Sequence, residues 1–166
     1  MPAITVDTKL VALIGSPLRQ SYSSRIHYRV YKELGLDYAY MPLEIPEKEN
    51  LGRVLEAIRV MNFAGFGVTK PYKEEIMSYL DEIDELAEQM GACNTVAVTD
   101  GKLKGYNTDG VGAITSLELD GGISIGGKTY FSFLRGYAAS NFTGVRLPYT
   151  KRDVGINFVE AREYFG

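Results

Sequence analysis

The sequence predicts an α/β fold with a mainly parallel sheet, helices on both faces and an antiparallel hairpin near one edge. Short apolar segments typical of buried strands alternate with segments of helical period, and the strongest turn signal, Asp100-Gly101, separates two strand-like runs. Polar clusters follow the predicted strands. Because ligands of such sheets bind beyond the carboxyl ends of the strands, the sequence predicts a functional site there.

The first part of the chain alternates a strand, a helix and a second strand. The almost continuous apolar run Lys9–Gly15 is typical of a strand buried on both faces. Apolar residues in Ile26–Leu34 recur at helical spacing, the hydroxyls of Ser21–Ser24 are candidates to cap this helix, and Gly35 ends it. The β-forming residues of Tyr38–Ile45 predict the next strand.

A second helix, a third strand, a long helical region and a hairpin follow. An apolar stripe of i, i+3, i+4, i+7 type predicts the helix, and the glycines of the third strand allow another group to approach its backbone. The expected ranges are Leu51–Met61 for the helix, Phe63–Thr69 for the strand, Tyr72–Met90 for a helical region broken near Leu80-Asp81, and residues 91–99 and 102–107 for the hairpin.

Composition and charge exclude several classes of protein. The 166 residues are 45% hydrophobic and 23% charged, as expected of a globular domain, and the net charge of −3 provides no field that would attract nucleic acid. No apolar run approaches the roughly 20 residues that span a bilayer, and the N-terminus lacks the pattern of a signal peptide. We therefore expect no nucleic-acid or membrane partner and a cytoplasmic location.

The single cysteine, Cys93, and the single histidine, His27, exclude an internal disulfide and a zinc site of ordinary composition. His27 occupies an apolar position of its predicted helix, which favours a structural role over that of a general base. We expect Cys93 to be a small buried hydrophobe.

Three separated stretches carry a family resemblance. They are Ser16-Pro17 with Ser21-Tyr22-Ser23 and Ile26-His27, then Gly67-Val68-Thr69-Lys70-Pro71-Tyr72-Lys73, and finally Gly91-Ala92-Cys93-Asn94-Thr95 followed by Gly105-Tyr106-Asn107-Thr108-Asp109-Gly110-Val111-Gly112. In order and spacing they resemble the substrate-binding domain of shikimate dehydrogenases, including the shikimate/quinate branch. The resemblance covers roughly residues 9 to 128.

The resemblance implies the NADPH-dependent reduction of 3-dehydroshikimate to shikimate, with quinate as a further possible ligand. It makes Lys73 the acid/base and Asp109 the residue that orients it. Ser21 and Ser23 would hold the substrate carboxylate, and the ring hydroxyls would be held by Thr69, Asn94 and Asp109.

The residues themselves support this chemistry and leave alternatives open. A lysine ammonium fixed against a carboxylate can exchange a proton with a substrate hydroxyl, but Lys73 could instead pair with the neighbouring Glu74 or Glu75. One serine of the Ser21/Ser23 pair could be only a helix N-cap, and Asn94 could satisfy backbone groups at a strand end. Residues 107–110 could be a turn with a helix cap, and Tyr72 could line the pocket.

The chain also departs from the family pattern. Gly67 stands where relatives usually carry Asn, which removes an amide from the site, Lys70 replaces a residue that is usually aliphatic, and Ser24 stands where Pro is common. After the linker the family continues with an NADP-binding Rossmann domain, whereas residues 135–139 lack its glycine pattern.

We therefore expect a substrate-binding domain at 1–119, a glycine-rich linker at 120–128 and an atypical tail at 129–166. NADP is the cofactor that the resemblance implies, and this chain alone is expected neither to bind it nor to catalyse the reaction. Two alternatives are a non-catalytic module that binds shikimate-like ligands and a truncated structural fragment that self-associates.

Overall fold

The computed structural model describes residues 4–19, 21–61 and 63–119. The predicted linker at 120–128 and the predicted tail at 129–166 lie outside the described residues.

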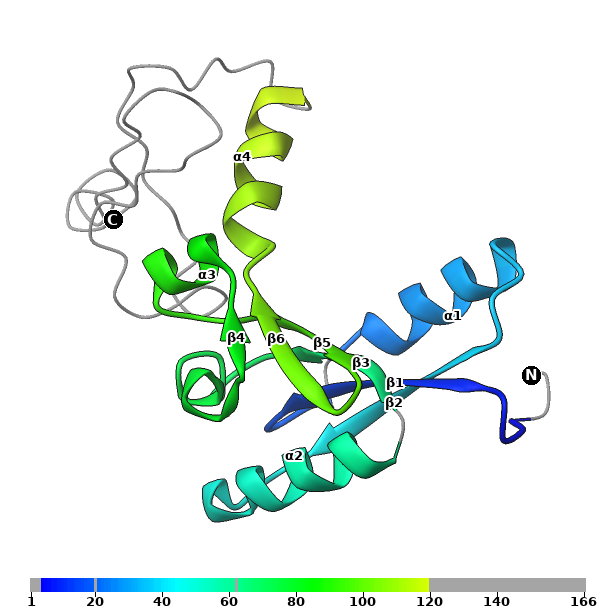
Figure 1. Cartoon of the computed structure of the whole chain (residues 1–166). Coiled ribbons are helices and arrows are strands. Elements are labelled where there is room, and N and C mark those ends of the chain that lie inside the picture. Colours follow the sequence, from blue (N-terminus) through cyan, green and yellow to red (C-terminus); the bar gives the residue numbers. More distant parts are fainter. Residues whose placement is uncertain (1–3, 20, 62, 120–166) are drawn as a thin grey trace.

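In the described part of the chain, six strands form one mixed sheet with the order β2-β1-β3-β5-β6-β4 (Figure 1). β1 pairs in parallel with β2 and β3, β4 pairs in parallel with β6, and β5 runs antiparallel to both β3 and β6. The strands are β1 Lys9–Gly15, β2 Tyr38–Glu44, β3 Phe63–Val68, β4 Glu82–Ile83, β5 Thr95–Thr99 and β6 Lys102–Tyr106. The predicted class is confirmed, and the β5–β6 hairpin lies next to the edge strand β4.

Two helices cover opposite faces of this sheet (Figure 1). Helix α2, Leu51–Val60, begins after a 3₁₀ turn, η1 (Lys48–Asn50), and buries Leu51, Leu55 and Ile58. This stripe joins a core that contains Ala12, Ile14, Phe66 and Val68. The apolar pattern read from the sequence therefore identifies the buried side of α2.

Helix α1, Ser23–Glu33, lies on the other face, next to β2, and none of its residues is fully buried. Its N-cap is Tyr22, and no side chain caps the first turn, so the expected serine cap is wrong. Instead, Ser21 Oγ accepts a hydrogen bond from Ser23 N at 3.3 Å. No helix in the described ranges is long and apolar enough to cross a membrane.

The long helical region expected over Tyr72–Met90 is wrong. The segment consists of a 3₁₀ turn, η2 (Glu75–Tyr79), the short strand β4 and helix α3 (Glu85–Met90). The backbone becomes extended at Leu80, and Asp81 N and Asp84 N donate to the carbonyls of Leu103 and Gly105. Pairing with β6 therefore replaces helical hydrogen bonds in the middle of this segment.

The first arm of the hairpin begins later than residue 91, the predicted start, and a helix follows the cap that residues 107–110 allowed. Residues 91–94 precede β5, and Gly91 ends α3 in a left-handed conformation with φ 62°. Helix α4, Asp109–Leu119, follows β6 directly and rises away from the sheet (Figure 1). Its first residue is Asp109, so this helix start brings a predicted site residue to the end of the sheet.

Candidate active site

The centre of the candidate site is an ion pair between Lys73 and Asp109. Lys73 Nζ donates to Asp109 Oδ2 at 2.5 Å, and the two side chains are only 12% and 27% exposed. Glu75, which the sequence offered as another partner for Lys73, instead pairs with Lys48 at 3.1 Å. The Lys73–Glu75 alternative is therefore wrong, and the structure joins the two residues that the resemblance named as the acid/base pair.

Asn94 holds the other oxygen of the same carboxylate. Its Nδ2 donates to Asp109 Oδ1 at 2.7 Å and to Thr108 Oγ1 at 2.9 Å, while its Oδ1 accepts from Thr108 N at 3.0 Å. The alternative that Asn94 satisfies backbone is thus part of its role, because one side chain binds both the backbone before α4 and the Asp109 carboxylate.

Asn107 holds the backbone of Asp109, a role that the sequence did not indicate. It is 3% exposed, its Nδ2 donates to Ala92 O at 2.9 Å, and its Oδ1 accepts from Asp109 N at 3.0 Å. A longer bond of 3.4 Å from Gly110 N reaches the same oxygen. Residues 107–110 are therefore a helix cap and also hold Asp109; an Asn two residues before an Asp at a helix start was the available signal.

Of the remaining predicted site residues, Thr69 directly follows β3, and Ser21 and Ser23 lie at the start of α1. Thr69 N donates to Ile14 O at 2.8 Å and Ser16 N donates to Lys70 O at 2.9 Å, so the loops that follow these neighbouring strands are tied together. Ser21 is exposed, whereas Ser23 and Thr69 are half-buried. The hydrogen bonds that join Lys73, Asn94 and Asp109 do not include these three residues.

Three other residues singled out in the sequence are packing residues. Tyr72 is 1% exposed and donates to Ile45 O at 2.6 Å, so the idea that it lines the pocket is wrong. Cys93 is fully buried, as expected, and burial raises the pKa of its thiol. His27 is half-buried, stacks on Tyr40 with ring centres 4.1 Å apart and has a pKa lowered by burial.

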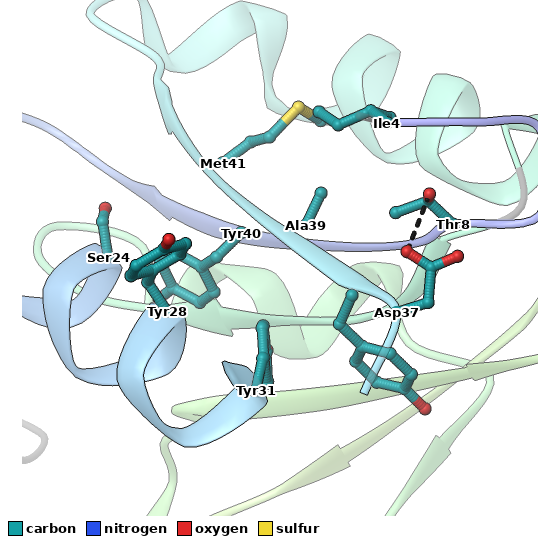
Figure 2. Close-up of a pocket in the computed structure, with 10 residues that line it drawn as sticks. Ile4, Thr8, Ser24, Tyr28, Tyr31, Asp37, Ala39, Tyr40 and Met41 are labelled. Atoms are coloured by element: carbon teal, nitrogen blue, oxygen red, sulfur yellow. Dashed lines mark hydrogen bonds between the residues drawn. The ribbon is translucent and has the colours of Figure 1, made fainter. Parts of the chain in front are cut away.

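A separate cavity of about 140 Å³ lies between the N-terminal segment, α1 and β2 (Figure 2). Its lining includes Tyr28, Tyr31 and Tyr40, and Thr8 Oγ1 donates to Asp37 Oδ1 at 3.0 Å beside it. Neither Lys73 nor Asp109 is among the residues that line it.

Gly15, the last residue of β1, does not form the glycine turn of a dinucleotide site. A Cβ there would collide with Thr69 Cγ2 and lie 3.0 Å from Lys70 O. This glycine therefore lets the ends of β1 and β3 pack together, whereas a dinucleotide turn uses its glycines to admit a pyrophosphate. Within the described ranges, no group of three or more potential metal ligands occurs either.

Comparison with known proteins agrees with this geometry. The family model described as the shikimate dehydrogenase substrate-binding domain matches residues 13–96. A shikimate dehydrogenase (NADP(+)) from Alkaliphilus oremlandii is 47% identical over 127 residues, which cover 76% of this chain and 44% of that protein. Another from Halothermothrix orenii is 49% identical over 121 residues, covering 73% of this chain and 42% of that protein.

Solved structures of two enzymes resemble this chain in fold and sequence. A shikimate 5-dehydrogenase from Listeria monocytogenes, in complex with shikimate and NAD, has a TM-score of 0.73 and 39% identity, covering 79% of this chain and 45% of that one. A 5-ketofructose reductase from a Gluconobacter strain has a TM-score of 0.69 and 30% identity, covering 75% and 44%.

The chain spans less than half the length of these curated relatives and solved structures. The matching family model covers half of the chain, and it includes the end of β1, all of β3 and the loop that carries Lys73. On this evidence the chain belongs to the shikimate dehydrogenase family, of which it contains the substrate-binding domain.

Proposed function

We propose that this domain binds shikimate and 3-dehydroshikimate, and that Lys73 and Asp109 form the acid/base pair of an NADPH-dependent shikimate dehydrogenase. The observation that carries the proposal is the Lys73–Asp109 ion pair, which Asn94 braces from its other side. In this assignment the chain supplies the half of the enzyme that binds substrate and moves the proton.

The proposed chemistry needs a proton donor next to a ketone oxygen. When the ketone accepts a hydride from the nicotinamide, its oxygen must gain a proton, and the Lys73 ammonium is the donor. The ion pair with Asp109 holds that ammonium in position. A carboxylate has about four acceptor positions, and the bonds from Lys73 and Asn94 use two of them, so Asp109 can also accept from a substrate hydroxyl.

The other assignments follow from the positions of the residues. Ser21 and Ser23, at the start of α1, are proposed to bind the substrate carboxylate, because hydroxyl groups near a helix N-terminus favour an anion. Thr69 follows β3 and Asn94 precedes β5. Both are proposed to bind ring hydroxyls of the substrate. Quinate shares this carboxylate and polyol chemistry and is a second ligand of the same site.

The relatives are NADP-dependent, so NADP is the proposed cofactor of the complete enzyme. Since the sequence of residues 135–139 lacks the glycine pattern of a dinucleotide turn, we propose that this chain does not bind NADPH by itself. The division into domain (1–119), linker (120–128) and tail (129–166) and the cytoplasmic location belong to this proposal.

Saturation-transfer NMR with shikimate tests the proposal, with 5-ketofructose as the comparison ligand suggested by the Gluconobacter relative. We expect millimolar binding of shikimate, at least about tenfold weaker in Asp109→Asn, because that variant removes the charge that aligns Lys73. The matched control is Lys48→Met, which breaks the Lys48–Glu75 pair outside the site and leaves binding unchanged. If the folded wild-type domain gives no transfer to shikimate, the proposal is wrong.

A further inference from the structure

We propose that Gly67 in β3 is a specificity-determining residue, because the space left by its missing side chain admits a hydroxyl on the substrate carbon that bears the carboxylate. Shikimate has no hydroxyl on this carbon, whereas quinate has one. Gly67 would therefore decide whether the site accepts quinate as well as shikimate. This inference rests on the proposed function and adds to it a residue that was given no role there.

Gly67 lies on the same face of the sheet as Thr69, a residue of the proposed site. A Cβ added at Gly67 would lie 3.3 Å from Leu13 Cδ1, and one added at Gly15 would collide with Thr69 Cγ2. Leu13 and Gly15 are two residues apart in β1, so they point to one face. The neighbours of Gly67 in β3 belong to the hydrophobic core on the opposite face, whereas Gly67 and Thr69 are half-buried. The face of Gly67 is therefore partly open to solvent.

The fold does not require a glycine at position 67. Gly67 is not among the glycines with a positive φ angle in the described part of the chain. The atom nearest to its added Cβ is the end of the Leu13 side chain, and the next two lie at ordinary van der Waals distances. Gly65 differs, because its added Cβ would lie 2.6 Å from Val96 O. Close packing therefore accounts for Gly65, whereas the space at Gly67 has no role in the fold.

Two oxygen atoms border this space. The added Cβ at Gly67 would lie 3.8 Å from Asn94 O and 3.9 Å from Tyr40 Oη. Asn94 O accepts from Val68 N at 2.8 Å, and a carbonyl oxygen has a second lone pair, while a phenol both donates and accepts. A ligand hydroxyl in this space can therefore donate to the Asn94 carbonyl and accept from Tyr40. A methyl group at position 67 would exclude that hydroxyl.

The space lies between the two ends of the proposed site. Tyr40 projects from β2 toward α1 (Figure 2), the helix at whose start the two proposed carboxylate-binding serines lie. On the other side, Asn94 donates to the carboxylate of Asp109, the partner of Lys73. A ligand that spans these ends passes over Gly67, with its carboxyl-bearing carbon on the side of Tyr40.

Shikimate and quinate differ at that carbon. In shikimate the carbon is planar, because it takes part in the double bond of the ring. In quinate it is tetrahedral and carries a hydroxyl in addition to the carboxylate, so the ligand is thicker where Gly67 leaves room. A side chain at position 67 would overlap this hydroxyl and leave the planar carbon of shikimate in place, which is discrimination by a clash with one of two ligands.

The test compares Gly67→Ala with the wild-type chain in ligand-detected NMR titrations with shikimate and with quinate. We expect the wild type to bind quinate within about threefold of shikimate. In Gly67→Ala the dissociation constant for quinate should rise at least about tenfold, and that for shikimate less than about threefold. Gly112→Ala is the matched control, because its added Cβ has nothing within 4 Å, and it should change neither constant.

The outcomes separate this inference from the proposed function. If the wild type binds quinate more than about tenfold more weakly than shikimate, the space is not used and the inference is wrong, while the proposed function stands. Equal effects of Gly67→Ala on the two ligands would also overturn the inference. A wild type that binds neither ligand overturns both proposals.

The wild-type amide spectrum gives a check that needs no variant. Quinate should shift the Gly67 signal further than shikimate does, because only quinate places a hydroxyl beside this residue. Equal shifts of the Gly67 signal with the two ligands would contradict the inference.

Discussion

Asp109 is fixed at both its side chain and its backbone. Lys73 and Asn94 bind its two carboxylate oxygens, and Asn107 accepts from its backbone N–H. These bonds hold the carboxylate against the lysine, so the geometry that the proposed acid/base role requires exists without a bound substrate. Such preorganisation is the main structural requirement for a positioned proton donor.

The roles of Lys73 and Asp109 can be separated in a chimera that carries an intact cofactor domain from a relative. Lys73→Ala should lower kcat by about 10²–10⁴-fold with a smaller change in KM, because a proton donor acts mainly in the transition state. Asp109→Asn should change both, and Ser21→Ala and Ser23→Ala should act chiefly on KM. Steady-state kinetics of NADPH oxidation would measure this, and equal small effects of all four substitutions on kcat would make Lys73 a binding residue only.

Asn107 should matter for stability as well as for the site. Asn107→Ala leaves the Ala92 carbonyl and the Asp109 N–H without this side chain, and we expect a loss of about 1–3 kcal/mol in the free energy of unfolding. Asn50, which precedes α2 without a side-chain cap bond, is the matched control. Urea denaturation of both variants measures the difference, and an Asn107→Ala variant as stable as Asn50→Ala would contradict the account.

At the scale of elements, the sequence predicted those that depend on local pattern and failed where a distant partner decides. The stripe of α2 and the hairpin turn at Asp100-Gly101 are local signals, and both are confirmed. The helix expected over Tyr72–Met90 does not form, because residues 81–84 pair with β6, some 20 residues later in the chain. The same limit applies to the site, since the motifs supplied Lys73 and Asp109 but gave no role to the Asn107 side chain that holds Asp109.

The Asp81 carboxylate holds this segment against its neighbours. It accepts from Leu103 N at 2.7 Å and from Arg59 Nη1 at 2.6 Å, and Arg59 also donates to Tyr79 O at 3.1 Å. The backbone bond from Leu103, followed by the bond from Arg59, lowers the pKa of Asp81 below its ordinary value of 3.8.

A folded-state pKa below the unfolded value means that the stabilisation by Asp81 is present above about pH 4 and lost as pH falls through the folded pKa. Asp81→Asn should therefore lower the Tm at pH 7, and the difference from wild type should shrink below pH 4. Thermal melts between pH 7 and pH 2.5 measure this, with the exposed Asp7→Asn as control. A Tm difference that is constant with pH would rule out a contribution from the Asp81 charge.

Gly105 in β6 is needed for close packing under the site. A Cβ there would overlap Leu80 Cδ1 and lie 2.8 Å from Cys93 Sγ, so Gly105→Ala should cost about 1–3 kcal/mol. Gly112 in α4 has nothing within 4 Å of its added Cβ, and Gly112→Ala should stabilise by about 0.4–1 kcal/mol. Chemical denaturation of the pair gives opposite signs if the packing is as described, and the same sign if it is not.

On the scale of the whole molecule, the described domain leaves one apolar stripe without cover. Ile26 and Val30 of α1 and its C-cap residue Leu34 are 61%, 42% and 66% exposed, although their helical spacing is that of a buried face. The sequence identified the stripe but could not show what covers it, because this depends on contacts beyond one element. Self-association of the chain stays a prediction.

The central claim is that this domain binds shikimate around the Lys73–Asp109 pair, where the loop after β3 meets the start of α4. A shikimate titration of the ¹⁵N-labelled chain tests it most directly. We predict that the largest amide shifts belong to residues 21–23, 69–73, 94 and 108–110, with little change in α2 on the opposite face. An absence of shifts, or shifts centred on α2 and its core contacts, would contradict this account.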